Sequence, residues 1–300
     1  MDFNEAEKTT KANQKMHDIQ ANYYDAANLI MLEEGADSQV RIANTVKYIA
    51  AKTTGEYLVD VGCGTGNILN FSETCFKKSL GVDVSFEMLS RNKGRKAKLI
   101  QADINCLPLK SSFADSVSCF SVVHHLYESD FLINESYRIL KPNGYFYSDN
   151  DPNKFSTELH DLNKQSAIFR MLMGIYFIPL RFSKSFRERA RLLNEFNQML
   201  KARGDCNDFE KLSHHAEYHL QSGLNPYEIK KRLEKAGFVD VRLYFHFRGK
   251  ELREKLDLSE TLSLLIRMIL KPKFRFDYES RYLSLYELAP YFAILARKPA

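Results

Sequence analysis

The sequence lacks the features that mark secreted, membrane-spanning and disulfide-bonded proteins. Its 300 residues hold only five cysteines, an odd number with no Cys-x-x-Cys pair, so buried free thiols fit better than disulfides or a zinc site. The first residues show no basic head followed by an apolar segment, so we expect no secretory signal. The longest apolar run covers only residues 171–180, whereas a spanning helix needs about 20 residues. We therefore predict a cytoplasmic protein without a transmembrane segment.

Neither sign of charge dominates the composition. Lys and Arg total 43 against 38 Asp and Glu, a formal net charge of +5, and 44% of residues are hydrophobic. This surplus is too small to indicate nucleic-acid binding by itself, and the apolar content is ordinary for a globular protein. There is no fixed-period repeat and no low-complexity tract. A chain of this length suits one α/β domain enlarged by insertions.

Hydrophobic periodicity divides the chain into helical and alternating parts. Apolar residues recur at helical spacing over the first fifty residues. From residue 56, short apolar runs alternate with helical stretches, which is typical of parallel βαβ units. A further helix is predicted at 226–236, ended by Gly237. The predicted strands cover residues 57–61, 80–84, 98–102, 116–123, 144–148, 238–247 and 291–297. The fold class that follows is α/β, with a Rossmann-like, doubly wound, seven-stranded sheet.

A glycine-rich turn follows the first predicted strand. Gly62, Gly64 and Gly66 alternate with Cys63 and Thr65, and such a turn lets a ligand approach the backbone and its free N–H groups. Nicotinamide-binding proteins use G-x-G-x-x-G, but Asn67 stands where the third glycine of that pattern would be. No Gly-Lys-Ser/Thr follows, so a phosphate-binding P-loop is excluded as well.

The segment Leu58-Val59-Asp60-Val61-Gly62-Cys63-Gly64-Thr65-Gly66 resembles the first motif of class I S-adenosylmethionine-dependent methyltransferases, of the type 11 and type 25 kind. Residues 107–117 and 138–144 are similar to this family's runs into the fourth and fifth strands, and residues 291–297 to its final antiparallel strand. The resemblance covers roughly 55–150 and 225–300. The alternative is a Rossmann-like domain that binds another adenosine ligand.

The resemblance implies S-adenosylmethionine as cofactor and suggests what holds it. Asp83, at the end of the second strand, would accept both ribose hydroxyls. Asp103, after the third strand, would hold the adenine amino group, with Ile104 beside the ring. Phe120 and Ser121 would surround the methionine part. The full predicted cofactor-binding set is Tyr23, Tyr24, Asp60, Gly62, Cys63, Gly64, Gly66, Asp83, Val84, Met88, Asp103, Ile104, Phe120 and Ser121.

The same resemblance suggests a division of the chain into four parts. Residues 1–54 form an N-terminal helical lid, in which Tyr23 or Tyr24 either covers the cofactor or simply packs within the helix. Residues 55–151 are the cofactor-binding core. Residues 152–224 are a helical insertion that forms the acceptor pocket. Residues 225–300 complete the core and carry a second helical insertion at 249–288, which is long for a connection between adjacent strands.

Two histidines are candidates for proton transfer. His124 follows the fourth strand, where doubly wound sheets bind ligands, and it is either a general base or a packing residue. His219 would share a helix face with His215 in the first insertion. The zinc-protease pattern requires Glu directly after the first histidine, but Ala216 stands there. We interpret His215 and His219 as lining of the acceptor pocket and predict no metal site.

For two further segments, a structural role is the preferred interpretation over a functional one. Residues 149–151 are an Asp-Asn-Asp triplet that cannot turn all its side chains to one ion from an extended chain, so we predict a solvated loop shaping the pocket. Residues 168–203 hold eight Lys or Arg against two Glu around an apolar run. This segment can contact a membrane surface or cap an apolar acceptor, with ordinary helix packing as the default.

The sequence constrains the methyl acceptor only by excluding some classes of acceptor. Class I enzymes that methylate planar amide or exocyclic amino nitrogens carry Asn/Asp-Pro-Pro-Tyr/Phe after the fourth strand, where this chain has Ser121-Val122-Val123-His124. Cytosine C5 enzymes carry Pro-Cys, but here Ser118 precedes Cys119. We therefore predict no DNA acceptor and favour a small, apolar or lipid-like molecule. A methyltransferase acting on RNA or protein, and a non-catalytic S-adenosylmethionine-binding protein, stay open.

Overall fold

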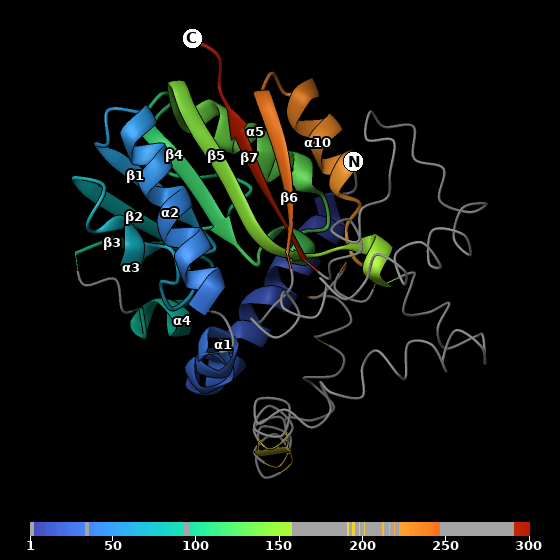
Figure 1. The fold of residues 1–300 in the computed structure, drawn as a ribbon. Coiled ribbons are helices and arrows are strands. Elements are labelled where there is room, and N and C mark those ends of the chain that lie inside the picture. The colour runs from blue at the N-terminus through green and yellow to red at the C-terminus, as the bar shows by residue number, and fades with distance from the viewer. Residues whose placement is uncertain are drawn as a thin grey trace, which may run out of the picture.

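The computed structural model describes residues 3–33, 36–92, 96–157, 222–246 and 291–300, together with residues 191, 194, 195, 198, 201, 212, 216 and 219. Seven strands form one sheet in the order β3-β2-β1-β4-β5-β7-β6 (Figure 1). Their bounds are β1 (Tyr57–Val61), β2 (Lys78–Asp83), β3 (Lys98–Gln101), β4 (Ala114–Phe120), β5 (Leu140–Pro152), β6 (Val239–His246) and β7 (Tyr291–Arg297). The predicted first and seventh strands have these same bounds.

Strand direction follows the predicted topology. Strands β1 to β5 pair in parallel, and β7 runs antiparallel between β5 and β6. In β1, Leu58, Val59 and Val61 are all fully buried, as expected for a strand covered on both faces. The Rossmann-like, doubly wound fold is confirmed.

Helices cover both faces of this sheet. Their bounds are α1 (Phe3–Glu33), α2 (Ala36–Lys52), α3 (Leu69–Ser72), α4 (Phe86–Ser90), α5 (Ser129–Ile139) and α10 (Pro226–Lys235), and a 3-10 turn, η1, spans Val123–His125. Apolar residues of α2, α3 and α4 share one buried cluster, while those of α5 and α10 belong to another on the opposite face. Each face therefore has its own core.

The N-terminal segment splits into two helices with different positions. Ile42, Val46 and Ile49 of α2 are buried against the sheet, at the i, i+4, i+7 spacing of one helix face. By contrast, α1 lies along the sheet edge toward which the arrow of β4 points (Figure 1). Within the predicted lid of residues 1–54, only α1 is placed over that edge.

The fourth predicted strand ends earlier than expected. Residues 121–123 were expected to continue it, but β4 stops at Phe120. Ser121 adopts a positive φ of 61°, which turns the chain out of the sheet and into η1. Apolar composition alone does not distinguish this turn from a strand.

The prediction of a solvated loop at residues 149–151 is wrong. These residues end β5, and Asp149 and Asp151 are 0% exposed. Arg41 of α2 donates two hydrogen bonds of 3.1 Å to Asp149, whose Oδ1 also lies 2.9 Å from Nε2 of His246. Partners brought from distant parts of the sequence make burial of these carboxylates tolerable.

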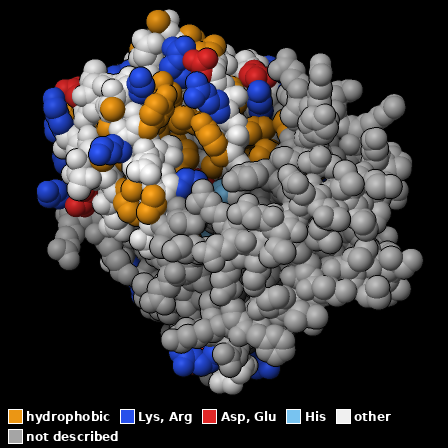
Figure 2. All heavy atoms as spheres, viewed as in Figure 1, with side chains coloured by type: hydrophobic (Ala, Val, Ile, Leu, Met, Phe, Trp, Pro, Cys, Tyr) orange, Lys and Arg blue, Asp and Glu red, His pale blue; other side chains and the backbone are white. Residues whose placement is uncertain are grey.

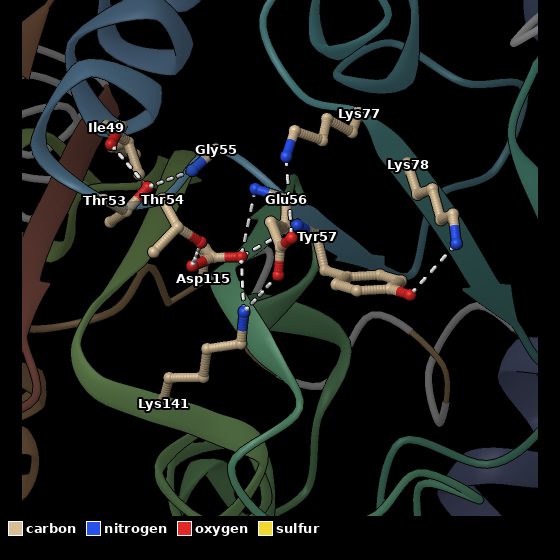
Figure 3. Close-up of polar contacts among 10 residues, drawn as sticks. All are labelled: Ile49, Thr53, Thr54, Gly55, Glu56, Tyr57, Lys77, Lys78, Asp115 and Lys141. Carbon is tan, nitrogen blue, oxygen red and sulfur yellow. Dashed lines mark hydrogen bonds and ion pairs between the residues drawn. The ribbon is translucent and has the colours of Figure 1, made fainter.

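A polar cluster holds the opposite, amino-terminal edge of the sheet together (Figure 3). Asp115 accepts hydrogen bonds from Oγ1 of Thr54 at 2.6 Å, from the backbone N–H of Tyr57 at 2.8 Å and from Nζ of Lys141 at 3.0 Å. Burial acts to raise the pKa of Asp115, but these three donors lower it overall. The cluster ties the starts of β1, β4 and β5 together, far from the edge that α1 covers.

Several predictions fall on other parts of the chain. The insertion at 249–288, His214, His215 and nearly all of segment 168–203 lie outside the described residues. Among the helices that the structure does describe, none is long and apolar enough to cross a membrane.

Candidate functional site

The glycine loop folds back on itself beyond β1. Gly62, Gly64 and Gly66 have φ values of 67°, 48° and 96°, which non-glycine residues rarely adopt. A Cβ on Gly62 would lie 2.6 Å from Val122, and one on Gly66 would lie 2.7 Å from Oδ1 of Asn92. At Gly64, by contrast, the added atom would meet only Tyr24, at 4.0 Å. Close packing therefore favours glycine at positions 62 and 66. At position 64 there is open space, and the backbone conformation alone favours glycine.

Asp83 organises the floor of the site at the end of β2. Its Oδ2 accepts the backbone N–H of Gly64 at 2.8 Å, and its Oδ1 accepts that of Ser85 at 2.9 Å. Burial raises the pKa of Asp83, with the hydrogen bonds and nearby His17 acting in the opposite direction. Each carboxylate oxygen can accept more than one hydrogen bond, so acceptor capacity is left for a ligand hydroxyl.

A pocket of about 700 Å³, part of it open to solvent, lies above these residues. It sits at the carboxyl ends of β1, β2 and β4, where the strand order of doubly wound sheets reverses and ligands bind. The structure brings ten predicted cofactor-binding residues to its wall. These are Tyr24, Gly62, Gly64, Asp83, Val84, Met88, Asp103, Ile104, Phe120 and Ser121.

Three other predicted cofactor residues, Asp60, Cys63 and Gly66, are not among the residues that line the pocket. Asp60 is buried within the sheet, where it accepts a 2.9 Å hydrogen bond from Oγ of Ser118, and burial raises its pKa to about 8. Cys63, within the glycine loop, is buried, and burial raises the pKa of its thiol well above the usual value. Gly66 packs against Asn92. Tyr23 lies in α1, but its side chain is outside the described set.

The predicted catalytic histidines are not pocket-lining residues. His124 is buried behind the wall, with Nδ1 2.9 Å from Oδ1 of Asp151, and burial raises the pKa of Asp151 to about 7. His219 donates its backbone N–H to the carbonyl of His124 at 3.0 Å, and burial lowers its pKa. Their catalytic role stays a prediction.

Sequence reasoning did not assign three residues of α1 to the pocket wall. Thr10, Asn13 and His17 line the pocket together with the predicted Tyr24, and so does His125 of η1. The spacing of the three α1 residues places them on one helix face, which was a detectable signal. The sequence could not show, however, that this face turns toward the sheet edge.

The pocket fits a nucleoside with a polar tail. The glycine loop leaves room beside Gly64, Asp83 offers acceptor capacity, and Val84, Met88 and Ile104 supply apolar surface for a planar ring. Two buried polar atoms in the wall, Oδ1 of Asn13 and Nδ1 of His17, have no hydrogen-bond partner within the described part of the protein. The fold and the site together define a Rossmann-like nucleoside-binding protein.

Comparison with known proteins narrows this class. Residues 59–148 match the family described as "Methyltransferase domain", a segment that contains the glycine loop, Asp83 and Asp103. This part of the chain is a class I S-adenosylmethionine-dependent methyltransferase domain.

Two curated relatives illustrate the similarity and its extent. The chain is 28% identical over 101 residues to a tRNA (carboxymethyluridine(34)-5-O)-methyltransferase of Arabidopsis thaliana, covering 33% of this chain and 24% of the relative. It is 34% identical over 95 residues to an uncharacterized protein of Methanocaldococcus jannaschii, covering 31% and 36% of the two chains. The match therefore spans well under two thirds of either relative's length.

A solved structure supports the fold over a longer stretch. A SAM-dependent methyltransferase from Thermotoga maritima superposes with a TM-score of 0.51 and 15% identity, covering 95% of this chain and 99% of that one. At this identity the likeness establishes a shared fold.

Proposed function

We propose that the protein transfers a methyl group from S-adenosylmethionine to an acceptor molecule. The observation that carries this proposal is the pocket at the carboxyl edge of the sheet, where Gly64, Asp83, Asp103 and Ser121 converge. The family match over residues 59–148 supports it independently.

The proposed cofactor position follows from the chemistry of each wall. Asp83 accepts the ribose hydroxyls with the acceptor capacity that Gly64 and Ser85 leave unused. Asp103 accepts from the adenine amino group, and Ile104 packs against the ring. Phe120, Ser121 and the glycine loop hold the methionine end, over which Tyr24 closes.

The bound cofactor supplies an electrophilic methyl group on a sulfonium centre. The protein's own residues hold the reactants in line and exclude water, a positioning effect that can supply roughly 7–11 kcal/mol. A base is needed only where the acceptor must lose a proton first. His124, held by Asp151, and His219 are the proposed groups for that step, and a large loss of turnover in His124→Gln or His219→Gln with unchanged cofactor binding would support the assignment.

We further propose that the acceptor is a small molecule. The pocket is roofed by α1, whose residues Thr10 to Tyr24 reach from the loop after β3 to the glycine loop. On the face drawn in Figure 2, the Lys and Arg side chains of described residues lie scattered among apolar and uncharged ones. A site that tracks a nucleic-acid backbone gathers its basic residues along one groove. These two features favour a small acceptor over a polynucleotide.

RNA is the second candidate. The relative from Arabidopsis thaliana carries a name that specifies a tRNA uridine as its acceptor. That match covers only 33% of this chain. It therefore supports use of the same methyl donor more than use of the same methyl acceptor.

One labelling experiment separates the two acceptors. The full chain is incubated with methyl-labelled S-adenosylmethionine and either a small-molecule metabolite extract or total tRNA. We expect label in the small-molecule fraction. Label in tRNA alone would overturn the small-molecule assignment, and label in neither would contradict the proposed activity.

A further inference from the structure

Helix α1 presents a polar face to the pocket. Thr10, Asn13, His17 and Tyr24 follow one another at intervals that keep them on one side of the helix, and all four line the pocket. The helix is fixed there by its neighbours, since Nδ2 of Asn105 donates to Oγ1 of Thr10 at 3.3 Å. About two turns further along, Oγ of Ser85 donates to Asp18 at 2.5 Å.

The orientation of the Asn13 amide is set by its surroundings. Its Nδ2 donates to the carbonyl of Thr9 at 3.0 Å and to the carbonyl of His125 at 2.8 Å. Both amide hydrogens are therefore used, and the flipped amide would set its oxygen against two carbonyl oxygens. Oδ1 is left as a buried acceptor without a partner, so it requires a donor.

His17 presents a second such atom one helical turn away. Its Nδ1 is also buried and without a partner, and the ring packs edge-on against His125 and Tyr24, with centroids 5.0 Å and 6.4 Å apart. Burial and neighbouring His125 lower the pKa of His17 to about 4, although Asp83, Asp18 and Gln20 act to raise it. The ring is thus neutral at pH 7. A neutral imidazole has one donor and one acceptor nitrogen, and we assign the unpartnered Nδ1 as the acceptor.

Buried acceptors are almost always paired in native proteins. Two such acceptors lie one helical turn apart in the wall of one pocket. They therefore indicate a ligand group that donates hydrogen bonds to them. We propose that Oδ1 of Asn13 and Nδ1 of His17 form a subsite that binds a hydroxyl or amino group of a ligand in this pocket. The proposal rests on the proposed function, because the donor group belongs either to the cofactor or to the methyl acceptor.

Two substitutions of His17 isolate the acceptor atom. His17→Phe keeps a ring that packs against His125 and Tyr24 but removes Nδ1. His17→Asn is the matched control, because its amide oxygen can occupy the place of Nδ1. Thermal unfolding of both variants establishes that each is folded before any ligand is added.

Calorimetric titration with S-adenosylhomocysteine tests the cofactor as the source of the donor group. In that case His17→Phe binds at least tenfold more weakly than the wild type, and His17→Asn binds within about threefold of it. If all three proteins bind equally, methyl transfer from labelled cofactor to a metabolite extract tests the acceptor as the source. There, His17→Phe forms product at least tenfold more slowly and His17→Asn keeps most of the rate.

Equal affinity together with equal product formation, including no product from any of the three, would overturn the subsite. Failure of the proposed function looks different, because the wild type itself would then bind no S-adenosylhomocysteine. In that event, titration of the same three proteins with adenosine, which carries both hydroxyl and amino donors, tests the subsite alone. A loss of adenosine affinity in His17→Phe alone supports the subsite. Equal adenosine binding by all three proteins, or no binding by any of them, overturns the subsite.

Discussion

At the scale of single residues, Asp83 links the fold of the site to its chemistry. Its carboxylate orients the glycine loop through the Gly64 N–H and begins α4 through the Ser85 N–H. The same carboxylate faces the pocket. One side chain therefore orients the glycine loop and also lines the pocket beside it.

We predict that Asp83→Ala weakens S-adenosylhomocysteine binding by about 1–3 kcal/mol, because charge-assisted hydrogen bonds to the ribose are lost. Asp83→Asn, which keeps one acceptor oxygen, should lose less. Calorimetry on the two variants and the wild type measures the difference. Unchanged affinity in Asp83→Ala would contradict the ribose assignment.

Asp60 carries a prediction about pH. Its pKa is raised to about 8 in the native protein from an ordinary value of 3.8, so the folded state keeps a proton that the unfolded state releases between these pH values. The stability that the neutral carboxyl contributes is complete below pH 3.8 and declines as the pH rises to about 8. Asp60→Asn can still accept from Ser118 and has no proton to lose.

Asp60→Asn should therefore exceed the wild type in stability at pH 8.5, by up to about 5 kcal/mol, and the advantage should shrink toward pH 4. Urea unfolding at several pH values between these limits measures the difference. A stability difference that does not vary with pH would refute the protonated state of Asp60.

At the scale of elements, α2 is joined to the sheet by a buried charge pair. Arg41 binds Asp149 at the end of β5, and Asp149 also binds Tyr147 and His246. Burial acts to raise the pKa of Asp149, but His246, Arg41 and Tyr147 hold it below its usual range. Removing one partner of a buried pair leaves a charge that neither water nor protein fully compensates.

Arg41→Ala should lower the free energy of unfolding by about 2–4 kcal/mol. The control is Arg91→Ala, which breaks an exposed pair with Glu87 on α4 and should cost less than about 1 kcal/mol. Urea denaturation of both variants measures the contrast. Equal losses would show that Asp149 does not depend on Arg41.

Helix α1 gives the second prediction at this scale. Because its polar face forms a wall of the pocket, a bound ligand should restrain it. We predict that S-adenosylhomocysteine slows amide hydrogen exchange across residues 9–24, while exchange in β7 stays unchanged. Equal protection in α1 with and without ligand would show that this helix does not respond to binding.

The elements also show what the sequence could predict. Strands such as β1 and β7 are mainly apolar segments whose bounds follow from local composition. The continuation of β5 through Asp149 to Pro152 does not, because burial of these residues depends on Arg41, His124 and His246. Likewise, ten of the residues predicted from the sequence line the pocket, whereas Asn13 and His17 were not predicted, because they reach it only through the packing of α1.

At the scale of the whole molecule, we propose that donor and acceptor recognition rest on different parts of the chain. The proposed donor half lies at the ends of strands β1 to β4 and falls within the methyltransferase-family match over residues 59–148. The acceptor half is proposed to involve residues 152–224, nearly all outside the described ranges. The cofactor pocket is therefore the feature on which the account depends.

Calorimetric titration of the full chain with S-adenosylhomocysteine tests that pocket most directly. The account predicts saturable binding at one site per chain, and a clear loss of affinity in Asp83→Ala when that variant is folded. Binding that is absent from the wild type, or that is unaffected in Asp83→Ala, would contradict the assignment of this pocket to S-adenosylmethionine.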